Sequence, residues 1–274
     1  MVDDSTLRLV ETRHGRMLVN PQDTLIGRAL IVYGEHQENQ VRFLCQILRA
    51  GDVVIDVGAN IGTMTVPMAR AVGGRGMVYA YEPQQPVFHA LCTNVALNGL
   101  SMRTRLYPVA LSSRTSRARV DITAYNATVE GNFGAITLEQ TISPEGRTPV
   151  AIDTLSDHLD GCLERLRLIK IDVEGMDVDV LDGARGLLKR FRPYLYVEAD
   201  SPRAAKATVT LMRQENYKAF WHLPRAFNIN NFNGNSENLI GRVVSVNMFA
   251  IPAESATVIY DLREVMTGDE DYPV

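Results

Sequence analysis

Short apolar runs alternate with stretches of helical periodicity along most of the chain, and this alternation constrains the fold more than any other feature. The apolar runs are rich in β-branched and aromatic residues, which is typical of buried strands. Strands that alternate with helices pair in parallel and carry helices on both faces of the sheet, so we predict a doubly wound α/β fold. Strands are predicted at residues 53–57, 77–81, 106–110, 168–172 and 194–198, and helices at 63–71, 86–97, 178–190 and 203–216.

The same pattern divides the chain into three parts. A long polar insertion at residues 112–149 is expected to border the functional site, because such insertions in compact domains are more often functional than idle. We predict an N-terminal extension packed on the core (residues 1–50), a main domain (51–252) and a C-terminal tail (253–274).

Weaker signals lie at the two ends of this pattern. Residues 17–19 and 29–32 have the composition of short strands, and residues 40–48 have helical periodicity. Residues 243–251 predict a final strand.

Composition excludes several classes of protein. The chain of 274 residues is 46% hydrophobic and carries a formal net charge of −4, which argues against a nucleic-acid partner. No run reaches the roughly 18 apolar residues of a membrane helix, so no membrane partner is expected. The first residues carry two acids, Asp3 and Asp4, where a secretory signal would be basic and then apolar, and we expect a cytoplasmic protein. The three cysteines (Cys45, Cys92 and Cys162) are too far apart to suggest a disulfide framework or a zinc site.

A loop with two glycines follows the first predicted strand, from Asp56 to Gly62, where open α/β sheets bind ligands. Gly58 and Gly62 allow a tight turn and a close approach of backbone to ligand. The middle glycine of the G-x-G-x-x-G motif is missing, so a dinucleotide is disfavoured and a cofactor with adenosine but no pyrophosphate remains compatible. The carboxylate of Asp56 could receive an ammonium group.

The second predicted strand ends at Glu82-Pro83. An acid at this strand tip can accept both hydroxyls of a ribose. Pro83 favours extended backbone at Glu82, which directs the side chain away from the strand end. The loop and the acid together predict an adenosine site.

These motifs together resemble the FkbM family of S-adenosylmethionine-dependent methyltransferases, over about residues 33–252. The resemblance implies a class I, Rossmann-like methyltransferase fold, with Glu82 on the cofactor ribose and the residues after Val109 near its adenine. One departure is Ala199, where a polar residue is expected between Glu198 and Asp200. The matching segments are 51–62, 81–83, 94–98, 109–111, 169–175, 196–198, 221–224 and 246–248.

With this resemblance, S-adenosylmethionine is the expected cofactor. The cofactor-binding residues are predicted to be Asp56, Gly58, Asn60, Gly62, Thr63, Glu82, Pro83, Ala110 and Asp172.

Acidic residues end the fourth and fifth predicted strands. If these strands are neighbours, Asp172, Glu174 and Glu198 converge beside the sulfonium of the cofactor, and their mutual repulsion raises the pKa of a carboxylate that serves as a base. The alternative for Lys170 is a structural ion pair with Asp172 or Glu198. A divalent cation held by these acids is a further alternative, not favoured because a tight ligand pattern is missing.

A hydroxyl acceptor must lose its proton during methyl transfer, and His222 is the best single candidate for the base. It follows Trp221 and precedes Leu223-Pro224, which would fix it on a turn; a structural histidine is the alternative. We therefore predict His222, Asp172 and Glu198 as catalytic residues. The other histidines, His14, His36, His89 and His158, lie in contexts typical of surface or helix.

Two polar segments offer further contacts. The loop 130–135 and the asparagines between residues 228 and 238 suit a polyhydroxylated acceptor, although turn formation explains most of them. Glu35 and Glu38 could cap the next helix or close over the cofactor.

The leading hypothesis is an S-adenosylmethionine-dependent O-methyltransferase acting on a hydroxyl of a small molecule or glycan, of sugar or polyketide type. The alternatives are a methyltransferase of RNA or another nucleic acid, an NAD(P)-dependent oxidoreductase on a similar fold, and a cofactor-binding module without activity. The sequence indicates no oligomeric state.

Overall fold

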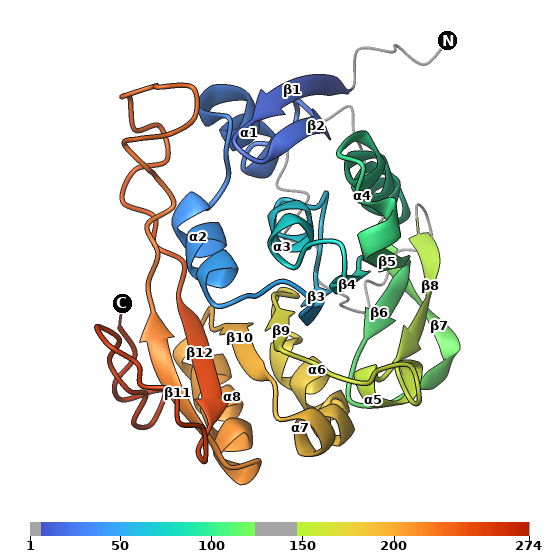
Figure 1. Cartoon of the computed structure of the whole chain (residues 1–274), viewed down its shortest axis with the longest axis vertical. Coiled ribbons are helices and arrows are strands. Elements are labelled where there is room, and N and C mark those ends of the chain that lie inside the picture. The colour runs from blue at the N-terminus through green and yellow to red at the C-terminus, as the bar shows by residue number, and fades with distance from the viewer. Residues whose placement is uncertain (1–6, 124–146, 274) are drawn as a thin grey trace.

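A seven-stranded sheet forms the centre of the molecule (Figure 1). The computed structural model describes residues 7–123 and 147–273. The sheet consists of β3 (Val53–Val57), β4 (Met77–Tyr81), β5 (Thr104–Tyr107), β9 (Leu168–Ile171), β10 (Tyr194–Glu198), β11 (Tyr217–His222) and β12 (Asn247–Pro252). Their order is β11-β12-β10-β9-β3-β4-β5, and β12 alone runs in the opposite direction to the other six strands. The predicted mostly parallel sheet is confirmed.

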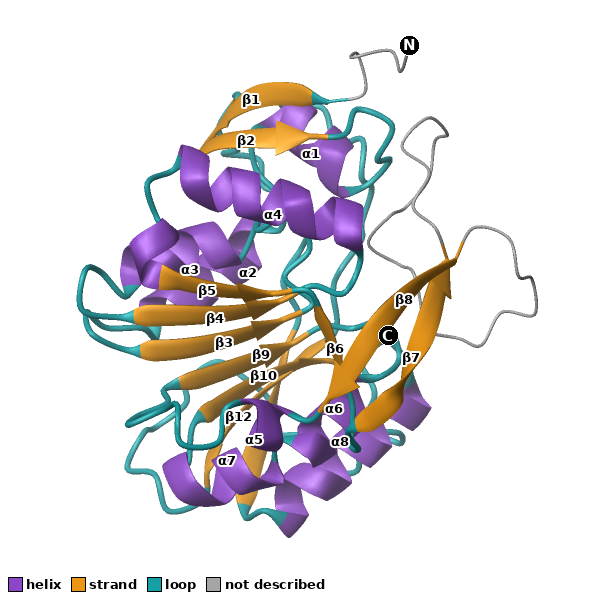
Figure 2. Cartoon of the chain, turned by 90° about the vertical axis from the view of Figure 1, so that its right-hand side faces the viewer, coloured by secondary structure: helices purple, strands orange, loops and turns teal. Residues whose placement is uncertain are grey.

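Helices cover both faces of this sheet, as predicted (Figure 2). One face packs against an apolar cluster that includes Leu44, Val66 and Leu91, and the other against a cluster that includes Leu181 and Val209. The predicted helix at 178–190 is two consecutive helices. The first face carries α2 (Glu38–Gln46), α3 (Thr65–Ala71) and α4 (Gln85–Leu97), and the second carries α5 (Leu155–His158), α6 (Asp177–Gly183), α7 (Arg185–Phe191) and α8 (Pro202–Gln214).

The N-terminal residues form a hairpin, β1 (Arg8–Thr12) and β2 (Gly15–Val19), followed by α1 (Ile26–Tyr33). The strand predicted at 29–32 is therefore wrong. Ile26, Leu30 and Tyr33 recur at helical spacing and bury one face of α1, a pattern that outweighs the β-branched pair Ile31-Val32.

Asn94 on α4 connects this hairpin to the glycine loop. Its side-chain oxygen accepts a hydrogen bond from the backbone N–H of Leu18 at 2.6 Å, and its amide nitrogen donates to the carbonyl of Ile61 at 2.9 Å. Asn94 is fully buried, so these bonds satisfy polar groups that have no access to water.

The strand predicted at 106–110 divides between two sheets. It is interrupted at Pro108, which has no N–H to donate to a ladder. β5 ends at Tyr107, and β6 (Val109–Leu111) joins a three-stranded sheet with β8 (Arg147–Asp153) and β7 (Ser116–Thr123), in the order β6-β8-β7. This break turns β6 toward the carboxyl ends of the central strands.

The last residues pack along β10 and β11. The indole N–H of Trp221 donates to Asp271 at 3.0 Å, and the hydroxyl of Tyr272 donates to the carbonyl of Ala199 at 2.7 Å. The predicted final strand is present as β12, and it begins four residues later than expected. Within the described residues, no helix is long and apolar enough to cross a membrane.

Candidate active site

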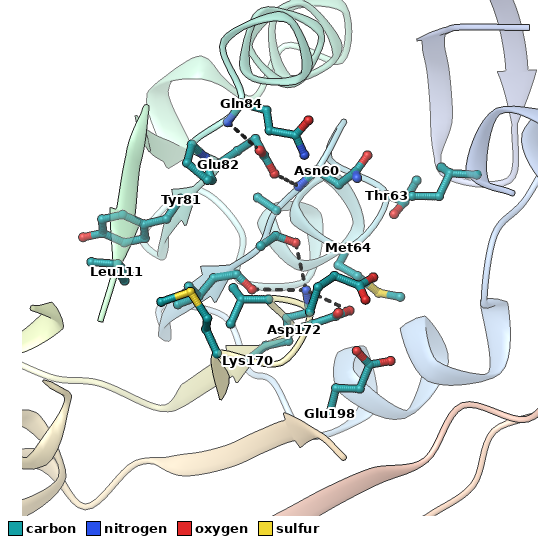
Figure 3. Close-up of a pocket in the computed structure, with 18 of the residues that line it drawn as sticks. Asn60, Thr63, Met64, Tyr81, Glu82, Gln84, Leu111, Lys170, Asp172 and Glu198 are labelled. Atoms are coloured by element: carbon teal, nitrogen blue, oxygen red, sulfur yellow. Dashed lines mark hydrogen bonds and ion pairs between the residues drawn. The ribbon is translucent and has the colours of Figure 1, made fainter. Parts of the chain in front are cut away.

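A cavity of about 1080 Å³, partly open to solvent, lies at the carboxyl ends of β3, β4, β9 and β10. Figure 3 shows the side chains of Glu82, Lys170, Asp172 and Glu198 around it. Residues from the ends of several strands therefore lie close together at one edge of the sheet, as expected.

Glu82 lies at the end of β4 and is 4% exposed. Its carboxylate accepts hydrogen bonds from the backbone N–H groups of Asn60 at 3.1 Å and Gln84 at 2.8 Å (Figure 3). Burial raises the pKa of Glu82 to about 7, although both backbone bonds and Lys170 oppose the shift. Each carboxylate oxygen can accept more than one hydrogen bond, so capacity remains for two hydroxyls of a ligand.

The glycine loop passes close to the residues that follow β9. A Cβ on Gly58 would lie 1.8 Å from the carbonyl oxygen of Asp172, and the φ of Gly58 is +74°. Asn60 also has a positive φ, 49°, and its side-chain oxygen accepts from the N–H of Ile61 at 2.7 Å. The loop is thus held in a strained turn whose backbone faces the cavity, as expected for a ligand-binding loop.

Asp56 lies beneath this loop and is not among the described residues that line the cavity. Its carboxylate is 3.3 Å from the ammonium of Lys170 and accepts from the hydroxyl of Thr65 at 2.6 Å. The expectation that Asp56 receives an ammonium of the ligand does not fit this position, because its carboxylate pairs with the ammonium of Lys170. Asp56 is fully buried in the strand and is not accessible to a ligand.

Lys170 is the centre of an ion-pair network, as in the alternative considered for it. Its ammonium is 3.5 Å from Asp172 and donates to the carbonyl of Gly58 at 3.1 Å. Burial lowers the pKa of Lys170, but Asp172 and Asp56 more than offset this, and the pKa lies above its usual value. The lysine therefore stays charged and neutralises the two carboxylates.

The acids at the ends of β9 and β10 converge as predicted, and their pKa values are raised. Burial, followed by repulsion from Asp172, raises the pKa of Glu174 to about 7 and that of Glu198 to about 10. A protonated Glu198 donates a hydrogen bond to Asp172. At neutral pH, Glu198 is thus suited to donating a proton in a hydrogen bond rather than to accepting one.

His222 lies at the end of β11, outside the set of described residues that line the cavity. Its Nδ1 is 2.7 Å from the hydroxyl of Tyr196, and its ring stacks on Phe43 with a centroid distance of 4.1 Å. Two strand spacings separate it from Glu198, because both residues pair with Asn247 on β12. These contacts fit a structural histidine, which was the alternative to a catalytic role.

His36 lines the cavity, although its sequence context had suggested a surface residue. It lies between α1 and α2, and Gln37, its neighbour, also lines the cavity. Burial lowers the pKa of His36 to about 4, with Asp172 raising it and Lys170 lowering it further. No local pattern signals this position, because it depends on how the N-terminal residues pack on the domain.

Most of the other predicted ligand-binding residues line the same cavity. The loop 130–135 lies outside the described residues, and Gly62 is not among the described residues that line the cavity. Glu35 and Glu38 pair with Arg13 and His14 of the hairpin, both at 2.7 Å, rather than with a ligand. The predicted residues found on the wall are Gly58, Asn60, Thr63, Glu82, Pro83, Ala110, Asp172 and Glu198.

The described side chains contain no group of three or more His, Cys, Asp or Glu residues with the geometry of a metal site. Asp172 accepts a hydrogen bond from the protonated Glu198 and lies beside the ammonium of Lys170, which is unfavourable for a cation.

The strand order defines a class I methyltransferase fold, and the turn at Gly58 and the acid at Glu82 lie at its ligand-binding edge. A model of the methyltransferase FkbM domain matches residues 56–219, more than half of the sequence, and the chain belongs to this family. The family is one of methyltransferases, and it implies S-adenosylmethionine as methyl donor.

Two named relatives have similar sequences. Methyltransferase sdnD from Sordaria araneosa is 28% identical over 163 residues, covering 50% of this chain and 61% of the relative. The hexuronic acid methyltransferase AglP from Haloferax volcanii is 28% identical over 156 residues, covering 56% of this chain and 58% of the relative. The chain thus spans about three fifths of the length of these relatives.

Solved structures of similar fold include an FkbM methyltransferase from Methylobacillus flagellatus, with a TM-score of 0.46 and 14% identity over 76% of this chain and 50% of the other. An O-methyltransferase from Thermotoga maritima has a TM-score of 0.47 and 14% identity, covering 92% and 79% of the two chains.

Proposed function

We propose that this methyltransferase transfers the methyl group of S-adenosylmethionine to a hydroxyl of a small molecule or glycan, and that the acceptor is uncharged. The observation that carries the proposal is the charge of the cavity wall. One end has the acid suited to a ribose, and the other end has three acids and one lysine that is already paired.

The residues of the first end, which we call the adenosyl half, are Asn60, Glu82 and Ala110. Glu82 accepts the ribose hydroxyls, Ala110 on β6 contacts the adenine, and the turn at Gly58 brings backbone close to the methionyl group. The cofactor, when bound, supplies a methyl group on a positively charged sulfur. Asp56 acts through Lys170 by holding the glycine loop in place.

The residues of the other end, which we call the acceptor half, are His36, Asp172, Glu174 and Glu198. Glu198 is protonated at neutral pH, but the carboxylates of Asp56 and Asp172 together with the partly ionised Glu174 outweigh the single charge of Lys170. The resulting negative potential favours a positively charged sulfonium and disfavours an anionic acceptor. Among the described residues of the wall, Lys170 is the sole lysine or arginine, and its charge is shared by Asp56 and Asp172. A neutral hydroxyl meets no such repulsion.

The same potential argues against a nucleic-acid acceptor, whose phosphates would approach these acids. The name of AglP supports a sugar as acceptor. A hexuronic acid carries a carboxylate, however, and the acids of this cavity favour a neutral sugar for this chain. The oxidoreductase alternative is overturned by membership of the methyltransferase family.

Two measurements test the proposal. Calorimetry with S-adenosylhomocysteine should detect binding at one site per chain. Radiolabelled S-adenosylmethionine is then incubated with p-nitrophenyl β-D-glucopyranoside or p-nitrophenyl β-D-glucuronide, a pair that differs by one carboxylate. We expect methylation of the glucoside with the higher kcat/KM. Preference for the glucuronide, with transfer to its carboxylate, would contradict an uncharged acceptor.

A further inference from the structure

The segment that joins α1 to α2 reaches the wall of the cavity from the N-terminal part of the chain. It places His36 in the acceptor half, near Asp172 and Lys170, whose charges both act on the imidazole. Nδ1 of His36 is buried and has no hydrogen-bond partner. Buried polar atoms in proteins are nearly always paired, so this unpaired nitrogen leaves the imidazole able to form a hydrogen bond with a group that enters the cavity.

Both neighbours of His36 are fixed by contacts with distant residues. The carboxylate of Glu35 pairs with Arg13 at 2.7 Å and accepts hydrogen bonds from Asn228 at 2.8 Å and from the N–H of Phe232 at 2.9 Å. Gln37 has a φ of 47° and its side chain donates to Ser245 at 3.2 Å. A non-glycine residue in this conformation costs energy and persists only where its surroundings hold it, as they do at many active sites.

We infer that His36 is the base that removes the proton of the acceptor hydroxyl, an inference that rests on the proposed function. As the methyl passes to the acceptor oxygen, the S–C bond breaks and its electron pair stays on sulfur. The new O–C bond forms from an oxygen lone pair, the O–H bond breaks, and the proton moves to a nitrogen of the imidazole. The sulfonium loses its positive charge while the imidazole gains one, so the net charge of the cavity is unchanged.

The environment of His36 fits this role better than that of the other candidates. Burial keeps its imidazole neutral at neutral pH and thus able to accept a proton, and the nearby carboxylate of Asp172 stabilises the imidazolium that forms. Glu198 is already protonated. His222 is engaged by Tyr196 and Phe43 and does not line the cavity.

The first test compares three variants of the full chain, H36Q, H222Q and H89Q. His89 lies exposed on α4 and serves as the matched control. With the glucoside as acceptor, we expect kcat of H36Q to fall by about 100-fold or more, the usual contribution of a general base. The Kd for S-adenosylhomocysteine and the melting temperature should stay close to those of the wild type, and H89Q should match the wild type throughout.

The second test does not depend on turnover. In ¹⁵N-labelled protein, the imidazole resonance of His36, identified by its loss in H36Q, should shift when S-adenosylhomocysteine is added, while that of His89 should not.

Unchanged kcat in H36Q, loss of turnover in H222Q alone, or a His36 resonance that does not respond to bound S-adenosylhomocysteine would overturn the inference. A wild type that does not bind S-adenosylhomocysteine contradicts the proposed function itself, and with it the inference. A wild type that binds it but methylates neither glycoside contradicts the proposed acceptor, and the resonance then decides whether His36 belongs to the site.

Discussion

The two halves of the cavity are built from different parts of the sequence. The adenosyl half consists of residues that directly follow β3, β4 and β5, each within a few positions of a strand end. The acceptor half combines the ends of β9 and β10 with His36, which is brought in by the N-terminal segment. The adenosyl half is formed by segments next to the strand ends, whereas the acceptor half depends on contacts between residues that are far apart in the sequence. Changes in the N-terminal segment can therefore alter the acceptor half without altering the strand ends that form the adenosyl half.

The largest effect is expected for Gly58→Ala, which affects both halves. The new Cβ would lie 1.8 Å from the Asp172 carbonyl oxygen, at a φ that disfavours any side chain. We expect a loss of about 2–4 kcal/mol in the free energy of unfolding and no detectable binding of S-adenosylhomocysteine. Urea denaturation and calorimetry measure the two effects. Gly74→Ala, with no heavy atom within 4 Å of its Cβ, is the control. Near-normal binding by Gly58→Ala would show that the loop can move away from β9.

A smaller effect, confined to the adenosyl half, is expected for Glu82→Ala. Loss of charged hydrogen bonds to the ribose should weaken binding of S-adenosylhomocysteine by about 1.5–3 kcal/mol. The KM for the glucoside at saturating cofactor should not change, because Glu82 is assigned to the adenosyl half. The exposed acid Glu164 supplies the control variant Glu164→Ala. An unchanged dissociation constant would remove the ribose assignment.

The smallest effect is expected for Glu198→Gln, in the acceptor half. Burial and Asp172 raise the pKa of Glu198 from 4.5 to about 10, so the folded protein takes up a proton that the unfolded chain has lost. The stability that this group contributes is complete below pH 4.5 and declines as the pH rises toward 10. Glutamine does not titrate, so the stability of the variant relative to that of the wild type should increase as the pH rises.

At pH 8 we expect the melting temperature of Glu198→Gln to exceed that of the wild type by about 2–4 °C, equivalent to roughly 1 kcal/mol, with no gain at pH 4.5. Differential scanning calorimetry across this range is the measurement. A difference in melting temperature that does not depend on pH would mean that Glu198 is ionised in the folded protein.

Sequence patterns predicted the sheet and the adenosyl half because their signals are contiguous. The turn at Gly58 and the acid at Glu82 each follow an apolar run, and the parallel sheet brings such ends together. The position of His36 has no contiguous signal, since it is set by the pairing of Glu35 with Asn228, 193 positions away. His222 was favoured as base because it follows a strand end, but β12 separates its strand from β10. Which strands are neighbours is a property of the whole sheet, not of any segment.

The carboxylate of Glu35 joins residues from near the two ends of the chain, Arg13 and the loop of Asn228 and Phe232. The segment that carries His36 is thus held from both sides by residues that are remote in sequence. A substitution at Arg13 or at Asn228 would therefore reach the acceptor half through Glu35, although neither residue lines the cavity.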